Sequence, residues 1–321
     1  MAKTAQERLD LKAEKLYKKT HKRKYRSKPS DIIFNILNYL VFGIFTLTCI
    51  FPFYYLFINT ISDNDLVVKG QINFIPRGLH LGNYASLLNV GDLSTAFMVS
   101  VSRTLLGTAL MVAASALVGY LVTKKEMWGR KFWYRFIVVT MYFNAGIIPI
   151  FLNMQMLGLT NNFWVYIIPG IVAPYNIILV KTYIESIPAE LEESACIDGA
   201  SYMTVFRKII WPLSKPILAT IAIFGAVGHW NSFTDSLIYM QSAPELYTLQ
   251  HRLYIYLNQA SNLKSLMQSG GQISEAALQS ALSSKIIKYT ISMVTVIPIL
   301  LVYPFMQRYF EEGIMLGAVK G

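Results

Sequence analysis

Long apolar segments alternate with short charged segments along most of the chain. Runs of about 20 apolar residues are long enough to cross a bilayer core about 30 Å thick. Six such runs can be marked out, at residues 32–57, 95–121, 132–152, 163–180, 216–238 and 289–305. The prolines and glycines inside these runs are compatible with a helix bundle, because neighbouring helices satisfy the backbone groups that such residues free. The pattern predicts an all-α membrane protein with six transmembrane helices.

The composition agrees with the bilayer as the solvent of this chain. Of its 321 residues, 54% are hydrophobic and 15% are charged, whereas about a quarter of the residues in a water-soluble domain carry charge. The first run is too long and too aromatic for a removable signal peptide and lacks a small-residue cleavage pattern, so we expect it to remain in the mature protein. Cys49 and Cys196 lie at different predicted depths and indicate neither a disulfide nor a metal site.

Basic residues are concentrated on one side of the predicted bundle. Residues 1–30 hold eleven Lys or Arg against three acidic residues, a net +8 out of the +11 of the whole chain. The next two loops on the same side are also basic, and they contain Lys124, Lys125, Arg130 and Lys131, then Arg207 and Lys208. Since positively charged loops stay in the cytoplasm, both termini are predicted to be cytoplasmic.

The predicted spans divide the chain into a basic N-terminal tail at residues 1–30, a six-helix domain at residues 31–307 and a C-terminal tail at residues 308–321. The N-terminal tail is interpreted either as a disordered segment that sets the topology or as a segment attracted to anionic lipid. Nucleic acid is disfavoured as its partner, because the tail has neither regularly spaced stacking aromatics nor a recognisable binding fold.

Motifs for catalysis or for a self-contained energy source are missing from the sequence. It contains no G-x-x-x-x-G-K-[ST] phosphate loop, no H-E-x-x-H, no C-x-x-C and no G-x-S-x-G. The four histidines fall in different predicted segments and are not expected to gather around a metal. The spans carry almost no ionisable residues, although ion-coupled carriers usually need them, and Asp235 is interpreted as an interfacial carboxylate. We therefore expect no catalytic residue, metal or cofactor in this chain, and an energy source on another chain.

The predicted cytoplasmic loop at residues 186–213 begins with the signals of a short helix. Pro188 suits a first helical turn, and Glu190, Glu192 and Glu193 follow where carboxylates favour a helix N-terminus. Gly199 then supplies a turn.

A second short helix is predicted after this turn. Ser201 can cap its start, and Pro212 is expected to end it. Residues paired at i, i+4 give it an apolar face made of Val205, Phe206, Ile209 and Ile210. Such a face either packs on its own bundle or docks in a groove of a partner. The residues by themselves favour packing on the bundle.

The loop closely resembles the motif E-A-A, three residues, G, nine residues, I-x-L-P, which marks the membrane subunits of ABC importers. The corresponding residues are Glu193, Ser194, Ala195, Asp198, Gly199, Ala200, Ile209 and Pro212. Two positions depart from the motif: Ser194 replaces an alanine and Trp211 replaces the leucine. The resemblance implies that the helix pair inserts in a groove of an ATPase subunit and transmits its closure to the bundle.

Three further segments resemble the second permease of maltose-type carbohydrate importers, especially the LplC-like or YtcP-like group that imports complex oligosaccharides. They are residues 70–84 in an outer loop, 298–305 in the last span and 313–321 at the glycine-rich C-terminal end. The resemblance implies a type I ABC importer fold in a bacterial plasma membrane. It also implies that the C-terminal residues Gly317, Lys320 and Gly321 contact the ATPase.

The partners implied by this resemblance are a second, dissimilar permease, two cytoplasmic ATPase subunits that bind ATP and Mg, and an extracellular solute-binding protein. Membrane lipid surrounds the bundle. Two alternatives remain open: an ABC permease for another solute, such as a peptide, amino acid or polyamine, and an ion-coupled secondary carrier.

Polar and aromatic residues at membrane depth are the candidates for a sugar path, because sugars need hydrogen-bond partners and flat faces against their C–H surfaces. They are Asn144, Asn176, Trp230 and Asn231. Each can instead serve as an interhelical hydrogen bond or packing anchor. The outer loop at residues 241–284 is interpreted as a contact for the binding protein or as a surface excursion with one amphipathic helix near residues 249–257.

Overall fold

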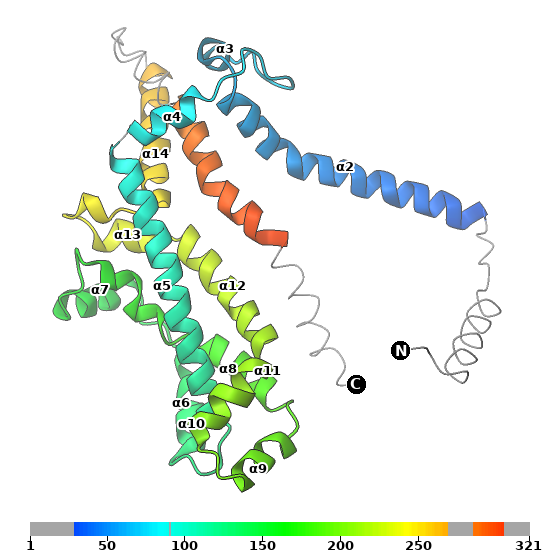
Figure 1. The fold of residues 1–321 in the computed structure, drawn as a ribbon. Coiled ribbons are helices and arrows are strands. Elements are labelled where there is room, and N and C mark those ends of the chain that lie inside the picture. Colours follow the sequence, from blue (N-terminus) through cyan, green and yellow to red (C-terminus); the bar gives the residue numbers. More distant parts are fainter. Residues whose placement is uncertain (1–28, 90, 269–284, 305–321) are drawn as a thin grey trace, which may run out of the picture. The chain divides into compact units, whose positions relative to one another are not determined.

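The computed structural model describes residues 29–89, 91–268 and 285–304, and within these ranges all regular secondary structure is helical (Figure 1). Three helices are long and apolar enough to cross a membrane unbroken. They are α2 (Pro29–Thr60), α5 (Gly91–Leu121) and the helix Lys285–Pro304. The chain forms two compact units, Met1–Tyr54 and Tyr55–Gly321. The second unit contains every feature discussed below except most of α2.

Three further candidate spans are bent pairs of shorter helices. The first pair is α6 (Arg130–Tyr142) with α7 (Ile147–Met156), bent by 120°. The second joins the 3-10 turns η1 (Phe163–Tyr166) and η2 (Ile168–Gly170) to α8 (Pro174–Ile184) at 43°. The third joins Tyr202–Leu213 to α12 (Lys215–Asn231) at 78°. If each pair is one crossing, the described residues hold up to six spans by length and composition, the predicted number.

Three of the predicted spans are not single unbroken helices: the run at residues 163–180 bends between η2 and α8, and two others are interrupted. The run at residues 132–152 is interrupted after Tyr142, where Gly146 adopts φ +85° and donates its N–H to Asn144 Oδ1 at 2.9 Å. The run at residues 216–238 is interrupted at Asn231, and α13 (Thr234–Tyr239) begins after an extended Ser232. Hydropathy did not reveal either break, because averaging over a window of about 20 residues hides a few polar residues and the break depends on backbone conformation.

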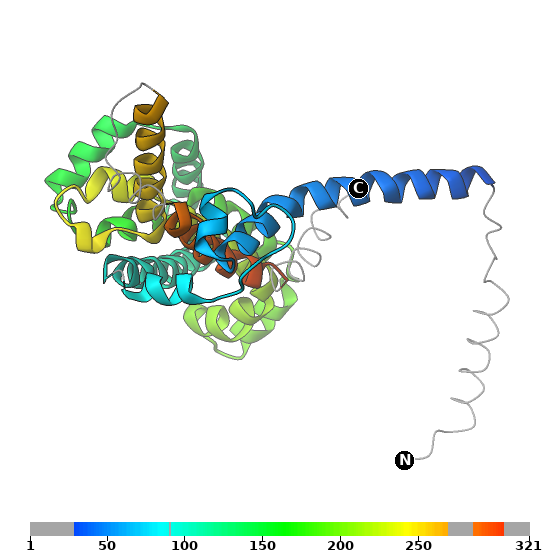
Figure 2. The same ribbon diagram turned by 90° about the horizontal axis from the view of Figure 1, so that it is seen from above.

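Helix α5 is the centre of the second unit and packs against α8, α12 and α14 (Leu249–Gln268). In Figures 1 and 2, α12 runs beside α5. Glycines allow this close approach: a Cβ on Gly225 would lie 2.6 Å from Met111 Cε, and one on Gly107 would lie 2.5 Å from His229 Nε2. Small residues are the usual means by which membrane helices pack closely.

The described part of the outer loop, residues 241–268, contains a helix that packs on α5. Helix α14 covers the helix predicted near residues 249–257 and extends it. Its first residue, Leu249, is 1% exposed and donates its N–H to Ser100 Oγ of α5 at 2.8 Å. Before α5, the short helix α3 (Asn64–Val68) is capped by Asp63, and α4 (Gly82–Asn89) follows.

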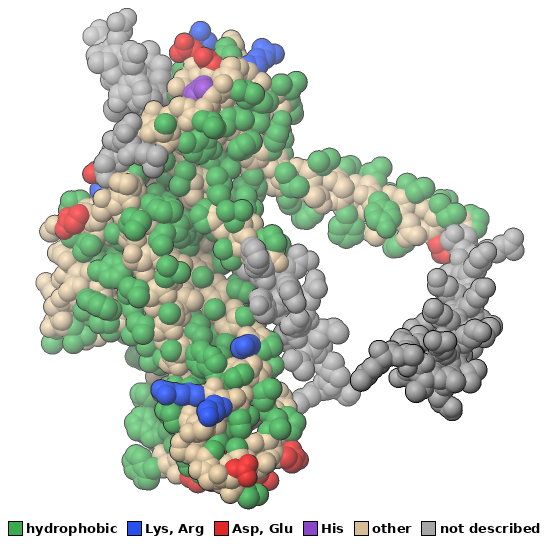
Figure 3. Space-filling model, viewed as in Figure 1, with side chains coloured by type: hydrophobic (Ala, Val, Ile, Leu, Met, Phe, Trp, Pro, Cys, Tyr) green, Lys and Arg blue, Asp and Glu red, His purple; other side chains and the backbone are tan. Residues whose placement is uncertain are grey.

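Much of the described surface is apolar, as expected for helices in contact with lipid. Figure 3 shows hydrophobic side chains over most of the face in view, with acidic and basic side chains near α9 (Glu190–Ile197) and at the opposite end. Large apolar side chains that are more than half exposed include Leu105, Phe136, Val139 and Ile148. Exposed apolar surface on this scale marks contact with a membrane or a partner.

Several predicted segments lie outside the described residues. They include nearly all of the N-terminal tail, residues 269–284 of the outer loop, and the whole C-terminal tail with Gly317, Lys320 and Gly321.

Candidate functional site

The predicted helix pair of the loop at residues 186–213 is present. Helix α9 has Glu190, Glu192 and Glu193 in its first turn, where carboxylates interact favourably with the helix dipole. The chain turns at Gly199, whose φ of +81° is accessible to glycine at low cost. Ser201 then caps the next helix by accepting a hydrogen bond from the Thr204 N–H at 3.3 Å.

The second helix has close to the predicted bounds but is less regular than predicted. It runs from α10 (Tyr202–Val205) through a π-helical turn, η3 (Phe206–Ile210), to α11 (Trp211–Leu213). The Trp211 N–H bonds to the Phe206 carbonyl, five residues back. The helix ends at Leu213, one residue after Pro212, where it was predicted to end, and α12 follows after a bend of 78°. Proline is tolerated in α11 because it lies in the first turn of that segment, where its missing N–H is not needed.

One face of this second helix packs on its own bundle. Val205 is fully buried, and Phe206 and Ile210 are 8% and 3% exposed. They form a core with residues of α5, α8 and α12, namely Ala116, Tyr120, Val180, Ile184, Leu218 and Ile221. The centres of the Trp211 and Phe206 rings are 5.8 Å apart in an edge-to-face arrangement. Trp211, which replaces the leucine of the motif, therefore packs at the margin of this core.

The other face of the helix pair is exposed. Leu191 and Met203 are each nearly half exposed, and Ile197 is 86% exposed. Most of the motif residues divide between the two faces. Glu193, Ser194, Asp198 and Gly199 are exposed, whereas Ala195, Ala200 and Ile209 are partly buried against the core. An exposed apolar surface rigidly backed by a packed core has the properties of a docking site for another protein.

Glu192 ties α9 to the end of α5. Its carboxylate forms an ion pair with Lys124, three residues beyond α5. The Tyr120 hydroxyl, in the last turn of α5, lies 3.3 Å from Glu192 Oε1 and 3.3 Å from the Tyr202 carbonyl. The Lys124 ammonium lies 4.3 Å from the centre of the Tyr120 ring. We call Tyr120, Lys124 and Glu192 the α5–α9 clasp. Sequence reasoning missed it, since no local pattern pairs residues so far apart in the chain.

The predicted substrate-path residues lie in three separate parts of the chain, with Trp230 and Asn231 together on α12, and each has a local partner. Asn144 is exposed in the break between α6 and α7, and Asn176 is buried with its Nδ2 3.2 Å from Met111 Sδ. Asn231 is exposed and accepts a hydrogen bond from Gln250 at 3.3 Å. Their role in substrate passage stays a prediction.

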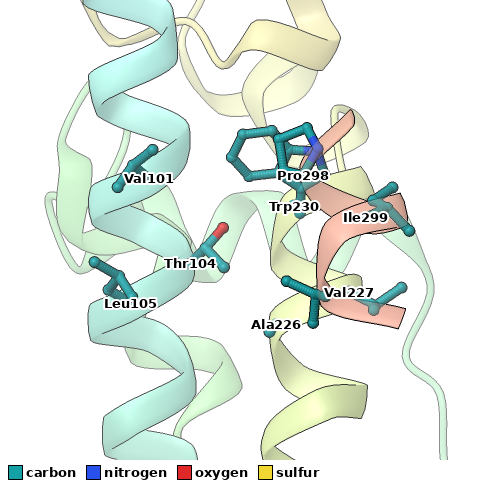
Figure 4. A pocket seen from close by; sticks show the side chains of 9 residues that line it. Val101, Thr104, Leu105, Ala226, Val227, Trp230, Pro298 and Ile299 are labelled. Atoms are coloured by element: carbon teal, nitrogen blue, oxygen red, sulfur yellow. The ribbon is translucent and has the colours of Figure 1, made fainter. Parts of the chain in front are cut away.

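Trp230, the fourth of these residues, lines a small apolar cavity of about 180 Å³ between α5, α12 and the helix Lys285–Pro304 (Figure 4). The cavity is otherwise lined by apolar side chains and Thr104. The indole N–H of Trp230 donates to the Thr295 carbonyl at 2.9 Å. This geometry is that of a packing anchor between two helices.

A second cavity, of about 410 Å³, has charged and polar side chains in a partly apolar lining, and we call it the polar cavity. Its lining includes Arg103 of α5, Tyr166 of η1, His229 of α12, and Asp235 and Tyr239 of α13. Arg103 is 2% exposed and paired with Asp235. Asp235 is 24% exposed and is the counter-ion of this buried arginine, a pairing that the sequence did not predict. Sequence reasoning overlooked Arg103 because it lies inside an otherwise apolar run.

Comparison with known proteins extends these observations to the whole chain. Residues 111–316 match the family model described as "Binding-protein-dependent transport system inner membrane component". The chain is 34% identical over 289 residues to the polygalacturonan/rhamnogalacturonan transport system permease protein YtcP of Bacillus subtilis (strain 168). This alignment covers 90% of this chain and 99% of YtcP. It is 32% identical to the protein LplC of the same organism, covering 90% of this chain and 95% of LplC.

A solved structure shares the fold. It is a chain from the crystal structure of a bacterial ABC transporter involved in the import of the acidic polysaccharide alginate, with a TM-score of 0.77 and 29% sequence identity. The alignment covers 88% of this chain and 98% of that chain. The chain therefore belongs to the family of binding-protein-dependent transport system inner membrane components and is a permease subunit of an ABC importer.

Proposed function

We propose that this chain is one of two dissimilar permease subunits of an importer for oligosaccharides in a bacterial plasma membrane, where it forms half of the translocation path. The observation that carries the coupling role is the helix pair with two faces. Its buried face is fixed to α5, α8 and α12, while its other face, with Ile197 at 86% exposure, is open to a partner.

The partners of this assembly are two cytoplasmic ATPase subunits, the second permease and an extracellular solute-binding protein. ATP and Mg bind to the ATPase subunits, and the present chain supplies transmission rather than catalysis. Basic residues at the loop end of α5 and in the second short helix support a cytoplasmic location of the coupling loop and of both termini.

The geometry suggests how ATPase closure reaches the membrane. A partner that moves α9 pulls on Glu192, and through Lys124 and Tyr120 on the end of α5. From Tyr120 to Arg103 is 17 residues along one helix, or about 26 Å at 1.5 Å per residue. Helix α5 therefore connects the α5–α9 clasp, at its C-terminal end, to the polar cavity, which Arg103 lines. The oligosaccharide class is supported by the relative YtcP, a polygalacturonan/rhamnogalacturonan transport system permease protein, and by the alginate importer that shares the fold.

Docking on α9 is tested by placing a charge on its exposed apolar surface. Ile197→Arg should leave the subunit folded, because the side chain is 86% exposed, but should abolish co-purification with the ATPase and ATP-dependent uptake in proteoliposomes. Leu79→Arg is the matched control, since Leu79 is 69% exposed in the segment between α3 and α4. Normal uptake and ATPase recovery with Ile197→Arg would falsify the coupling role.

The turn of the helix pair offers a second test. Gly199 has φ +81° and no atom within 4 Å of an added Cβ, so Gly199→Leu strains the turn without creating a clash. We expect loss of ATP-dependent uptake. Gly70→Leu is the matched control, because Gly70 has φ +71° and equally open surroundings outside the loop.

A further inference from the structure

The polar cavity lies where five elements of the second unit meet. Helix α5 contributes Arg103, the turns η1 and η2 contribute residues such as Tyr166 and Gly170, and the other lining residues come from α12, α13 and the connection between them. Its volume of about 410 Å³ falls within the range of about 300–1,000 Å³ that is usual for small-molecule sites. None of the four predicted substrate-path residues is among its lining residues.

Arg103 is the most unusual group in this cavity. Its guanidinium is buried, forms an ion pair with Asp235, donates from Nη1 to the Ser232 carbonyl at 3.2 Å, and lies 4.4 Å from the centre of the Tyr166 ring. Its Nε has no hydrogen-bond partner among the described residues. The free energy lost when an ion pair is removed from water often exceeds the attraction between its two charges. Ionisable groups inside membrane spans are therefore rare, and they usually have a function.

The absence of side chains at three glycines leaves space in and beside the cavity. His229 fits because Gly107 has no side chain, and the His229 ring also lies near Gly170, where an added Cβ would be 3.7 Å from Cε1. Gly228 lines the cavity, and an added Cβ there would meet no atom within 4 Å. A Cβ at residue 228 would therefore meet no packed neighbour, and a longer side chain there starts at the edge of the cavity.

We propose that this cavity binds one glycosyl unit of the transported oligosaccharide through its hydroxyl groups, an inference that rests on the proposed function. Both terminal nitrogens of Arg103 are engaged, so no guanidinium fork is free for a substrate carboxylate. Sugar hydroxyls both donate and accept. Asp235 Oδ1 already accepts from Arg103, Ser232 Oγ and the Ser236 N–H, but among the described residues Oδ2 accepts from Arg103 alone and can take a second hydrogen bond. The lining adds the hydroxyl of Tyr239. The aromatic lining supplies apolar surface for the C–H face of the ring.

Filling the cavity from Gly228 tests the proposal. The complete transporter, with its ATPase, second permease and binding protein, is reconstituted in proteoliposomes, and uptake is measured with galacto-oligosaccharides, arabino-oligosaccharides and oligogalacturonates. For the oligosaccharides that the parent imports, Gly228→Leu should raise the KM at least tenfold, and Gly228→Ala should raise it by a smaller factor. Gly43→Leu is the matched control: Gly43 is also helical with no atom within 4 Å of an added Cβ, and uptake should match the parent.

The outcomes separate the two levels of the argument. If the parent imports none of the three classes, the proposed oligosaccharide function fails and the inference fails with it. If the parent imports an oligosaccharide and both Gly228 variants retain its KM and maximal rate, only the inference is overturned, and the Arg103–Asp235 pair is structural. If Gly228→Leu does not assemble, the KM of Gly228→Ala decides: a rise of twofold or more supports the site, and an unchanged value overturns it.

Discussion

Lys124 and Glu192 form an ion pair that joins the chain just beyond α5 to the first turn of α9. The two side chains are 14% and 21% exposed, so the pair is partly withdrawn from solvent. Tyr120 contributes its ring to Lys124 and its hydroxyl to Glu192. The contact links the helix pair that faces a partner to the central helix of the bundle.

Breaking this pair should uncouple ATP hydrolysis from transport. Glu192→Gln removes the charge but keeps the shape of the side chain, and we expect the amount of sugar imported per ATP hydrolysed to fall several-fold. The measurement is uptake and phosphate release in the same proteoliposomes. Glu185→Gln, which removes a surface pair with Lys181 at 2.7 Å, is the control and should behave as the parent.

A charge exchange distinguishes coupling from a local folding defect. The double variant Lys124→Glu, Glu192→Lys restores an ion pair of opposite polarity and should recover most of the lost coupling, whereas each single reversal should be worse than Glu192→Gln. Equal losses in the single and double variants would show that the pair does not transmit the movement.

Removal of the charge of Asp235 should destabilise the second unit. Asp235→Asn leaves the buried Arg103 guanidinium without its counter-ion, a change that typically costs about 3–5 kcal/mol. Thermal unfolding in detergent should show a clearly lowered midpoint. Asp92→Asn is the control, because Asp92 is 68% exposed and pairs with Arg252 at 3.4 Å, and exposed pairs contribute at most about 1 kcal/mol.

The core beneath the helix pair should be sensitive to the size of Phe206. Its ring packs 5.3 Å from the Tyr120 ring and is 8% exposed. Phe206→Ala should therefore cost about 3–5 kcal/mol of stability, measured by unfolding, and should loosen α9 as well. Met203→Ala, at a 47% exposed position of the same helix pair, should cost much less. Equal destabilisation by the two variants would contradict the division into a buried and an exposed face.

His251 should make stability depend on pH. Its side chain is buried and shares a hydrogen bond of 2.9 Å with Ser236, and burial, together with the charge of Arg252, lowers the pKa of His251. Because the unfolded chain takes up this proton more readily, stability should be full above the unfolded pKa of about 6.5 and should decline as the pH falls below it. Unfolding midpoints between pH 7.5 and 5 should show the decline, and His251→Gln should flatten it. His80→Gln, at an outer-segment position, should leave the slope unchanged.

The sequence alone predicted the all-helical membrane class, the candidate spans and the helix pair of the loop at residues 186–213. These features depend on hydropathy over long windows and on turn and capping residues such as Gly199 and Ser201, which act within a few residues of chain. The family motif added the coupling role, because its spacing is fixed within one short segment.

The tertiary structure alone decided which side chains meet. Arg103 and Asp235, and likewise Lys124 and Glu192, are far apart in sequence and come together only when α5 packs beside α12 and the helix pair. It also decided where apolar runs break, at Gly146 and Ser232, and that one face of the helix pair is buried while the other is exposed. Local sequence patterns record the preferences of neighbouring residues, whereas these contacts arise from close packing between helices, in which one glycine such as Gly107 determines whether a side chain such as His229 fits.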